Sequence, residues 1–493
     1  GILMPIFSLP SRYGIGSFSK SAYQFVDMLK KAGQKYWQIL PLCPTSYGDS
    51  PYQSFSTYAG NPYFIDLDQL IEEKLLTRKE CQACDFGDDP QDIDYGKLYE
   101  NRFKLLRKAY ERANVGEDQE FEAYRRENAW WLDDYALFMA VKDQFDGVAW
   151  NEWAEDIRLR WSNAMDYYRR ELYYEIEFYS YLQFVFMKQW KKLKNYANIN
   201  GIEIIGDIPI YVAFDSADAW ANPELFQFDA ENLPTAVAGC PPDGFSADGQ
   251  LWGNPLYRWD YHRETGFDWW IRRIAYCSEL YDVVRIDHFR GFDEYYSIPY
   301  GDTTARNGHW EKGPGIALFE AAKNRLGELN IIAEDLGYIT DSVKKLVADS
   351  GFPGMKVLEF AFDSREKSDY LPYTYEKNSV VYTGTHDNET IAGWYAGLDK
   401  SDLKMCTDYM NIDRIPGKEY HWDFIRLAML SVSDLCVIPI QDYLGLDNRA
   451  RINHPSTLGT NWRWRLAKDQ LSASLLKEIR EMTRISGRLQ NGE

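Results

Sequence analysis

Short runs of apolar residues recur along the 493-residue chain, and most are separated by stretches with helical periodicity. Such near-continuous runs are typical of buried parallel strands. Eight are present, at 35–42, 61–67, 202–212, 281–286, 329–334, 355–360, 379–384 and 435–440. Their alternation with helices predicts an α/β fold, a (β/α)8 TIM barrel with inserted, mainly helical subdomains. The alternative is a doubly wound sheet, but no run is followed by G-x-G-x-x-G or G-x-x-x-x-G-K-[ST], so nucleotide binding has no support.

A different pattern covers residues 68–200, where Glu, Lys, Arg, Tyr and Trp recur with helical periodicity. Leu182, Val185, Phe186 and Trp190 fall on one helical face, a stripe more typical of core than of a binding site. The patterns together predict three regions. They are the start of the barrel with its first two strands and the DSPYQ loop (1–67), an inserted helical subdomain (68–200), and the remainder of the barrel with a long loop at 241–257 (201–493).

Charge makes two classes of partner unfavourable. With 55 Lys and Arg against 75 Asp and Glu, the net charge is -20, which repels nucleic acid and anionic membrane surfaces. A neutral substrate is compatible with this charge. Aromatic residues make up 16% of the chain, and rings that pair an apolar face with a polar edge suit sugars. The composition therefore hints at carbohydrate binding.

Cysteine usage indicates a reducing compartment. The seven cysteines are an odd number spread along the chain and do not form a disulfide framework. Cys81 and Cys84 make a lone C-x-x-C without the second pair that a zinc site needs. The first residues lack a basic segment before their short apolar run, and no run approaches the length of a membrane span. We therefore expect a soluble, cytoplasmic protein.

Charged residues end the apolar run in YDVVRIDHFRGF, residues 281–292. Because strand side chains alternate between faces, Arg285 and Asp287 are expected to point the same way and keep each other charged. Taken alone, the pair also fits a structural ion pair. Two more runs end in acids, since Glu334 follows NIIA and Asp387 follows VVYTGTH. In a barrel all three acids converge at the C-terminal rim, where active sites of such enzymes lie.

Paired carboxyl groups at one rim indicate retaining glycoside cleavage, in which a nucleophile and a proton donor stand about 5 to 5.5 Å apart. Asp287, charge-stabilised by Arg285, suits the nucleophile. Glu334 lies among apolar neighbours and beside Asp335, two influences that raise a carboxyl pKa and favour a proton donor.

Long motifs extend this pattern over nearly the whole chain. They include LPSRYGIGSF (9–18), KYWQILPLCPTSYGDSPYQSFSTYAGNPYFIDL (35–67), WWLDDYALFMAVK (130–142), GDIPIYVAFDSADAW (206–220), PPDGFSADGQLWGNPLY (241–257) and RINHPSTLGTNWRWR (451–465). Together with the three acids they resemble the amylomaltases, the 4-α-glucanotransferases of glycoside hydrolase family 77, which are related to α-amylases and to the plant disproportionating enzyme.

The resemblance implies that Asp287 forms the covalent glucosyl-enzyme, Glu334 is the acid/base and Asp387 holds ring hydroxyls and stabilises the transition state. It implies substrate-binding roles for nine further residues: Tyr52, Asp243, Phe245, Gln250, Trp252, Arg285, His288, His386 and Asn453. Tyr52 would stack on the sugar beside the cleavage point, and Trp252 would lie on the acceptor side. Asp207, where amylase relatives carry an aspartate, would be structural. The implied partners are α-1,4-glucans and maltooligosaccharides, with no cofactor and no metal.

Two departures from the family pattern bear on the substrate. Ile452 stands where the M-N-x-P motif has methionine, and Gly244 stands where many members have an aromatic residue. We expect one contact over the sugar to be missing, which leaves Phe245 to cover it alone.

Two other functions remain open at this point. A hydrolase of the same barrel would share all three acids, and a non-catalytic carbohydrate-binding protein would share the fold. The 241–257 motif resembles transferases specifically and argues against the first, whereas the intact acids argue against the second.

Overall fold

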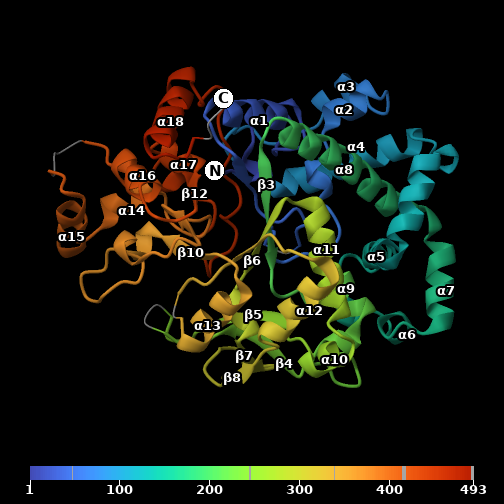
Figure 1. Ribbon diagram of the computed structural model, residues 1–493. Helices are drawn as coiled ribbons and strands as arrows, with labels where there is room; N and C mark the ends of the chain where they lie inside the picture. The colour runs from blue at the N-terminus through green and yellow to red at the C-terminus, as the bar shows by residue number, and fades with distance from the viewer. Residues whose placement is uncertain (47, 244–245, 338, 414–417, 490–493) are drawn as a thin grey trace.

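A closed barrel of eight parallel strands forms the centre of the computed structural model, which describes residues 1–46, 48–243, 246–337, 339–413 and 418–489 (Figure 1). Around the barrel the order is β1-β12-β11-β10-β9-β6-β3-β2. The strands are β1 (Ile2–Leu3), β2 (Tyr36–Gln38), β3 (Glu203–Pro209), β6 (Val283–Asp287), β9 (Ile331–Ala333), β10 (Gly354–Val357), β11 (Ser379–Tyr382) and β12 (Leu435–Pro439). The predicted (β/α)8 barrel is therefore confirmed.

One predicted strand is wrong, and the barrel takes its first strand from the N-terminus instead. Residues 61–67 contain a 3-10 turn, η2 (Pro62–Phe64), because the Asn61 side chain accepts the Tyr63 N–H and Pro62 has no N–H to give to a ladder. Ile2 pairs with Ile438 on one side and with Trp37 on the other, which closes the barrel. A strand of two residues carries too short a pattern to be read from sequence.

A separate apolar cluster contains residues from most of the barrel strands. Its buried members are Leu3, Ile205, Ile332, Met355, Val357, Val380, Tyr382 and Val437. Inward residues of alternate strands fill the centre of such barrels, so the interior is packed core and not a pore. Function must therefore lie at an end of the barrel.

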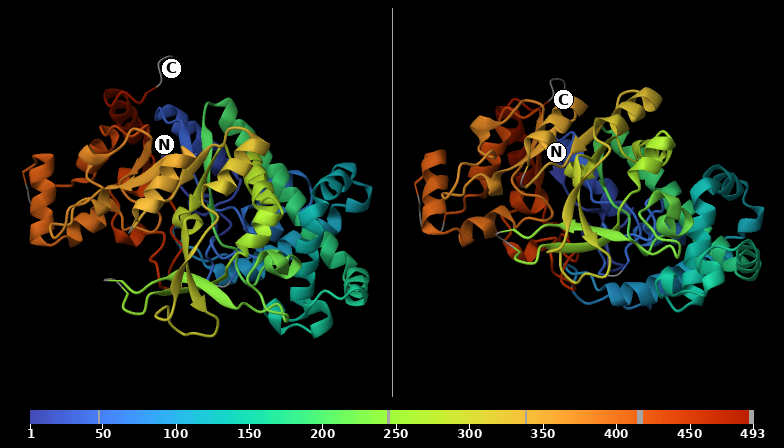
Figure 2. Two further views of the ribbon diagram at one scale, coloured as in Figure 1. Left: turned by 60° about the horizontal axis from the view of Figure 1, so that its bottom comes forward. Right: turned by 90° about the horizontal axis from the view of Figure 1, so that it is seen from below.

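Helices dominate the chain between β2 and β3. They are α2 (Leu67–Glu72), α3 (Arg78–Gln82), α4 (Tyr95–Arg112), α5 (Gln119–Gln144), α6 (Glu155–Arg158), α7 (Ser162–Glu171) and α8 (Tyr173–Ile199). The predicted stripe of 182, 185, 186 and 190 on α8 is buried, as expected for core. These helices lie on one side of the barrel, and the helices within residues 391–485 lie on the other in all three views (Figures 1 and 2). The division at 1–67, 68–200 and 201–493 remains our proposal.

The remaining helices flank or follow the barrel strands. They are α1 (Lys20–Lys31), α9 (Ala217–Ala221), α10 (Trp259–Glu264), α11 (Asp268–Leu280), α12 (Ile316–Leu326), α13 (Asp341–Ser350), α14 (Ile391–Gly397), α15 (Lys400–Met410), α16 (His421–Met429), α17 (Ile440–Tyr443) and α18 (Ala473–Ile485). One of the stretches with helical periodicity between the apolar runs, residues 316–325, lies within α12.

A second, antiparallel sheet was not predicted. Its strands are β4 (Ala236–Cys240), β5 (Gln250–Pro255), β7 (Glu294–Pro299) and β8 (His309–Lys312), in the order β5-β4-β7-β8. It is built from the segments that follow the carboxyl ends of β3 and β6, and it lies below the barrel in Figure 1. The part Gln250–Pro255 of the 241–257 segment, which was expected to be a loop, is therefore held in a sheet beside the C-terminal rim.

Candidate active site

The three candidate acids all lie at carboxyl ends of barrel strands. Asp287 is the last residue of β6, and Glu334 directly follows β9. Ile286 pairs with Ala333, so the next residues along the two strands are Asp287 and Glu334. Asp387 follows β11 by five residues. The fold thus gathers at one rim what the sequence separates by a hundred residues.

Arg285 binds a buried carboxylate as well as Asp287. Its Nη1 donates to both oxygens of Asp207, at 2.8 and 2.7 Å, while Nη2 donates to Asp287 Oδ1 at 3.1 Å. The side chains of Arg285 and Asp207 are 3% and 0% exposed. From the sequence alone, Arg285 was expected to pair only with Asp287. Asp207 lies opposite Arg285 because β3 pairs with β6, and this register is not evident from the sequence. The structural role inferred for Asp207 fits this contact.

Glu334 is held by two backbone donors, the N–H groups of His288 and Leu336, both at 2.7 Å. Burial, and next the charge of Asp287, raise the pKa of Glu334 to about 7, against the opposing effects of Arg285 and the two N–H groups. Asp335 was expected to contribute to this shift, but its carboxylate accepts the Met355 N–H at 2.8 Å instead. Glu334 is suited to carry a proton near neutral pH.

Asp287 has the lower pKa of the two. Burial raises its pKa to about 6, Asp207 and Asp387 add to the rise, and Arg285 and His386 oppose it. Asp287 therefore ionises before Glu334 as pH increases. Environments that separate two carboxyl pKa values in this order suit one group to be nucleophile and the other to be acid.

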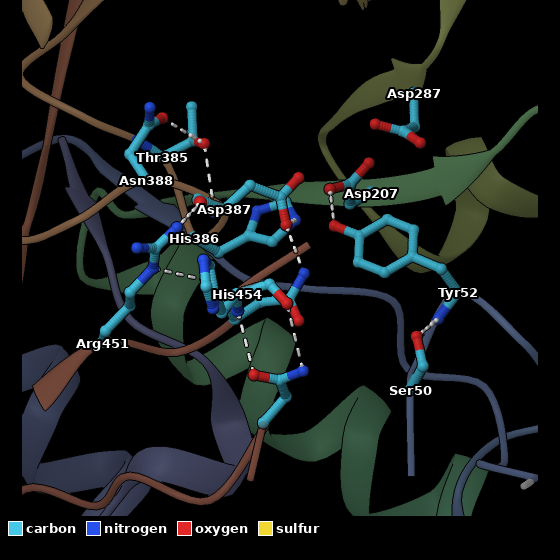
Figure 3. Close-up of polar contacts among 12 residues, drawn as sticks. Ser50, Tyr52, Asp207, Asp287, Thr385, His386, Asp387, Asn388, Arg451 and His454 are labelled. Carbon is cyan, nitrogen blue, oxygen red and sulfur yellow. Dashed lines mark hydrogen bonds and ion pairs between the residues drawn. The ribbon is translucent and has the colours of Figure 1, made fainter. Parts of the chain in front are cut away.

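Asp387 is fixed from three directions (Figure 3). Its Oδ1 lies 3.3 Å from His386 Nε2 and accepts the Asn453 amide at 2.6 Å, and its carbonyl accepts Arg451 Nη2 at 2.7 Å. Burial alone would raise the pKa of Asp387, but His386 and the Asn453 hydrogen bond lower it well below its usual range. Asp387 is a permanent negative charge at the rim.

Tyr52 contacts both Asp207 and His386 at the rim. Its hydroxyl donates to Asp207 at 2.6 Å, and its ring stacks on His386 at 5.2 Å and 13° between planes (Figure 3). Trp462 packs at 5.8 Å from the same ring. The ring is thus held in one orientation at the rim by contacts on several sides.

Trp252 and His288 form a second aromatic pair, edge to face at 4.9 Å. Gln250 orients the indole by accepting its Nε1–H at 3.0 Å. His288 has a left-handed backbone, φ 53°, which turns its N–H to Glu334. Burial, with Arg290, lowers the pKa of His288 to about 3, so this imidazole is neutral.

The remaining candidates divide into one exposed residue and one outside the described chain. Asp243 is exposed and accepts the Ser246 N–H at 2.7 Å, so it shapes its own turn. Phe245 and Gly244 lie outside the described residues. Two residues that the sequence reasoning missed, Arg451 and Trp462, both lie in the quoted 451–465 motif, which was the available signal.

The described residues contain no evident set of side chains that could ligate a metal ion. There, no group of three or more His, Cys, Asp or Glu side chains is arranged to hold a metal ion. All seven cysteines are free thiols. Among the helices of the described residues, none is long and apolar enough to cross a membrane.

A cavity of about 1240 Å³ lies away from this rim, among α3, α4, α5, α8 and the segment around Phe55 and Tyr63. None of the three acids lines it. We place the site by the convergence of strand-end carboxyls and their shifted pKa values, since volume alone says nothing about chemistry.

The fold and this rim define a class: a (β/α)8-barrel enzyme with the paired carboxyls of glycosidic-bond cleavage. Within that class the chain belongs to the 4-alpha-glucanotransferase family, glycoside hydrolase family 77, whose sequence profile matches residues 4–471. The resemblance seen in the sequence is confirmed, and the activity is that of a 4-α-glucanotransferase.

Individual members of the family are similar to this chain over nearly their full length. The chain is 49% identical to the 4-alpha-glucanotransferase of Clostridium butyricum, covering 98% of this chain and 100% of that protein. The counterpart from Streptococcus pneumoniae serotype 4 is 50% identical over 99% of this chain and 97% of its own length. The solved amylomaltase from Streptococcus agalactiae in complex with acarbose superposes with a TM-score of 0.96, at 44% identity and 99% coverage of both chains.

Proposed function

We propose that Asp287 is the nucleophile and Glu334 the acid/base of a retaining transfer between α-1,4-glucans or maltooligosaccharides. The observation that carries this assignment is the position of the two carboxyls at adjacent strand ends, with the pKa of Asp287 below that of Glu334. Near pH 6.5 one is ionised while the other still holds its proton. A retaining first step requires that combination.

The first half-reaction breaks the donor glycosidic bond. Asp287 attacks the anomeric carbon of the donor, and Glu334 gives its proton to the departing glycosidic oxygen. The products are a covalent glucosyl-Asp287 and a shortened glucan with a new 4-hydroxyl group. Asp387, ionised at all working pH values, is proposed to hold ring hydroxyls and to stabilise the positive charge that develops on the sugar.

The second half-reaction runs through the same groups in reverse. Glu334, now ionised, removes the proton from the 4-hydroxyl of an acceptor glucan, whose oxygen attacks the anomeric carbon and releases Asp287. Two inversions give net retention. We propose that Tyr52, Arg285, His288, His386 and Asn453 shape the donor side.

We propose that the acceptor side is formed by Trp252 with Gln250, and that Asp243 and Phe245 belong to the same segment. Water competes with the acceptor at a concentration of roughly 55 M, so transfer requires an acceptor bound in register and water kept out. The Gln250 hydrogen bond holds the Trp252 indole, and such a fixed ring suits stacking on a sugar.

Product analysis with maltotriose tests the proposal. Transfer yields glucose and a ladder of longer maltooligosaccharides with little gain in total reducing ends. Reducing ends formed as fast as maltotriose disappears, with no longer products, would favour the hydrolase of the same barrel. We also propose a cytoplasmic location, since seven free thiols suit a reducing compartment.

A further inference from the structure

The side chain of Glu359 is buried at the same rim, between strands that carry site residues. Glu359 lies in η7 (Leu358–Phe360), directly after β10, and β10 is flanked in the barrel by β9 and β11. Its N–H donates to the Thr383 carbonyl at 3.2 Å. Glu359 is 9% exposed, and no step proposed above uses it.

Glu359 packs directly over the loop that presents His386 and Asp387. A Cβ added to Gly384 would lie 2.8 Å from Glu359 Oε1 and 3.2 Å from Asn388 Cβ. The glycine therefore allows both side chains to close over the loop. A change in the charge or position of the Glu359 carboxyl therefore acts first on its contacts with Asn388 and with the backbone at residue 384.

A chain of hydrogen bonds leads from Asn388 to Asp387 (Figure 3). Asn388 Oδ1 accepts the N–H and the hydroxyl of Thr385 at 2.9 and 2.8 Å. Thr385 Oγ1 in turn accepts the Asp387 N–H at 3.2 Å. The position of Asn388 thus fixes the backbone from which the Asp387 carboxylate projects.

The surroundings of Glu359 disfavour a charge on it. Four groups face it: Asp442 from α17, Glu389 and Asn388 from the loop, and Arg451 from beyond η9 (Asn448–Ala450). Arg451 is already committed to the carbonyls of Asp387 and Asn453, at 2.7 and 2.8 Å. Within the described residues, Glu359 Oε1 has no hydrogen-bond partner.

An ionised Glu359 beside the Asp442 carboxylate is energetically unfavourable. The Asp442 oxygens accept the Thr383 hydroxyl at 2.5 Å and the Ile391 N–H at 2.8 Å, so they already bind this loop and the first residue of α14. Burial, and next Asp442 and Glu389, hold the pKa of Glu359 well above its usual range, while Arg451 and Asn388 oppose this. Two buried carboxylates side by side repel, so Glu359 stays protonated.

We propose that Glu359 is a positioning residue for the transfer reaction, which as an uncharged acid packs on the 383–388 loop and holds Asp387 and His386 in place. The inference rests on the proposed role of Asp387. Ionisation of Glu359 pushes it away from Asp442 and Glu389, which shifts Asn388 and, through Thr385, Asp387.

Two substitutions separate shape from charge. Glu359→Gln keeps the shape and carries no charge at any pH, so its turnover near pH 6.5 should stay within about threefold of wild type. Glu359→Ala removes the packing and should lower kcat by roughly 10- to 100-fold with KM changed less than about threefold, because Asp387 acts mainly on the transition state.

The alkaline pH profile measured with α-maltosyl fluoride as donor and maltose as acceptor gives the distinguishing result. Fluoride leaves without a proton, so the first step no longer needs protonated Glu334, and the second step needs Glu334 ionised. Ionisation of Glu359 is then expected to limit activity at alkaline pH, and Glu359→Gln should extend activity to higher pH. Asp218→Asn serves as the control, because it removes another buried carboxyl, 5% exposed, that binds the Thr57 N–H outside this loop.

The Glu359→Gln profile decides the question even if the Ala variant does not fold. An alkaline limb unchanged from wild type in Glu359→Gln overturns the inference, and so does wild-type kcat in a folded Glu359→Ala. A wild-type protein that does not turn over the fluoride contradicts the proposed function as well as the inference that rests on it. Activity that extends to higher pH in Glu359→Gln, with the wild-type limb retained in Asp218→Asn, supports it.

Discussion

Replacement of Arg285 by lysine tests whether the guanidinium sets the charge on the nucleophile. Arg285 makes three hydrogen bonds to two carboxylates, two to Asp207 and one to Asp287. Lysine keeps the positive charge but presents a compact ammonium, which cannot reproduce the planar fork. We expect the ammonium to stay with fully buried Asp207 and to leave Asp287 without its donor.

The magnitude follows from the bond that is lost. A hydrogen bond to a charged group contributes about 1.5–3 kcal/mol, and 1.4 kcal/mol is tenfold in rate, so kcat/KM should fall by roughly 10- to 100-fold. Arg285 is also the main group that lowers the pKa of Asp287 from the value burial alone would give. With weaker support that pKa rises above about 6, and the acid limb of the pH profile moves to higher pH.

The assay is kcat/KM for maltotriose disproportionation between pH 4.5 and 8.5, with the melting temperature as a check on folding. Arg285→Met is the matched variant, since it removes the charge and leaves buried Asp207 without its cationic partner. Breaking such a pair costs about 3–5 kcal/mol, so this variant should also melt at lower temperature. Wild-type rate and an unmoved acid limb in Arg285→Lys would refute the assignment of Arg285 to the nucleophile.

Three further results are expected. Wild-type activity should follow a bell-shaped pH profile, with limbs near the pKa values of about 6 for Asp287 and about 7 for Glu334, which titrate as a coupled pair. Activity should fall below the first value because the nucleophile gains a proton, and above the second because the acid loses one. A flat profile from pH 5 to 8 would contradict this assignment. Trp252→Ala should weaken acceptor use and raise the share of hydrolysis, seen as more reducing ends per maltotriose consumed, whereas an unchanged ratio removes Trp252 from the acceptor side. Tyr52→Phe keeps the ring on His386 and loses one bond to Asp207, so it should retain more activity than Tyr52→Ala in the same assay; equal losses would mean that the ring contributes nothing.

Most of the barrel was readable from the sequence because buried parallel strands leave continuous apolar runs. β3 is buried at its five central positions, and the run at 202–212 shows it. β1 was not readable, because two residues make no pattern, and 61–67 was misread because its apolar residues pack around a capped turn. The antiparallel sheet was missed because Gly239 and the exposed Leu251 weaken the alternation of β4 and β5.

The sequence names candidate site residues but does not show the contacts between them. Strand-end acids and long motifs point to side chains that the structure brings together at one rim, since periodicity indicates which residues end a strand. Pairing between strands far apart in sequence is not encoded in any local pattern, so Asp207 as the main partner of Arg285 came only from the register. The same holds for Asp335, whose sequence neighbour is Glu334 but whose hydrogen-bond partner lies on β10.

Trapping of the covalent intermediate tests the central assignment most directly. Glu334→Gln should accept α-maltosyl fluoride, because fluoride needs no proton, and then stall, because no base activates the acceptor. Peptide mass spectrometry of the quenched protein should find one maltosyl group on the peptide that contains Asp287, and none when Asp287→Asn is added. A maltosyl group on Asp207 or Asp387, or fluoride release by the double variant at the rate of Glu334→Gln, would contradict the assignment of Asp287 as the nucleophile.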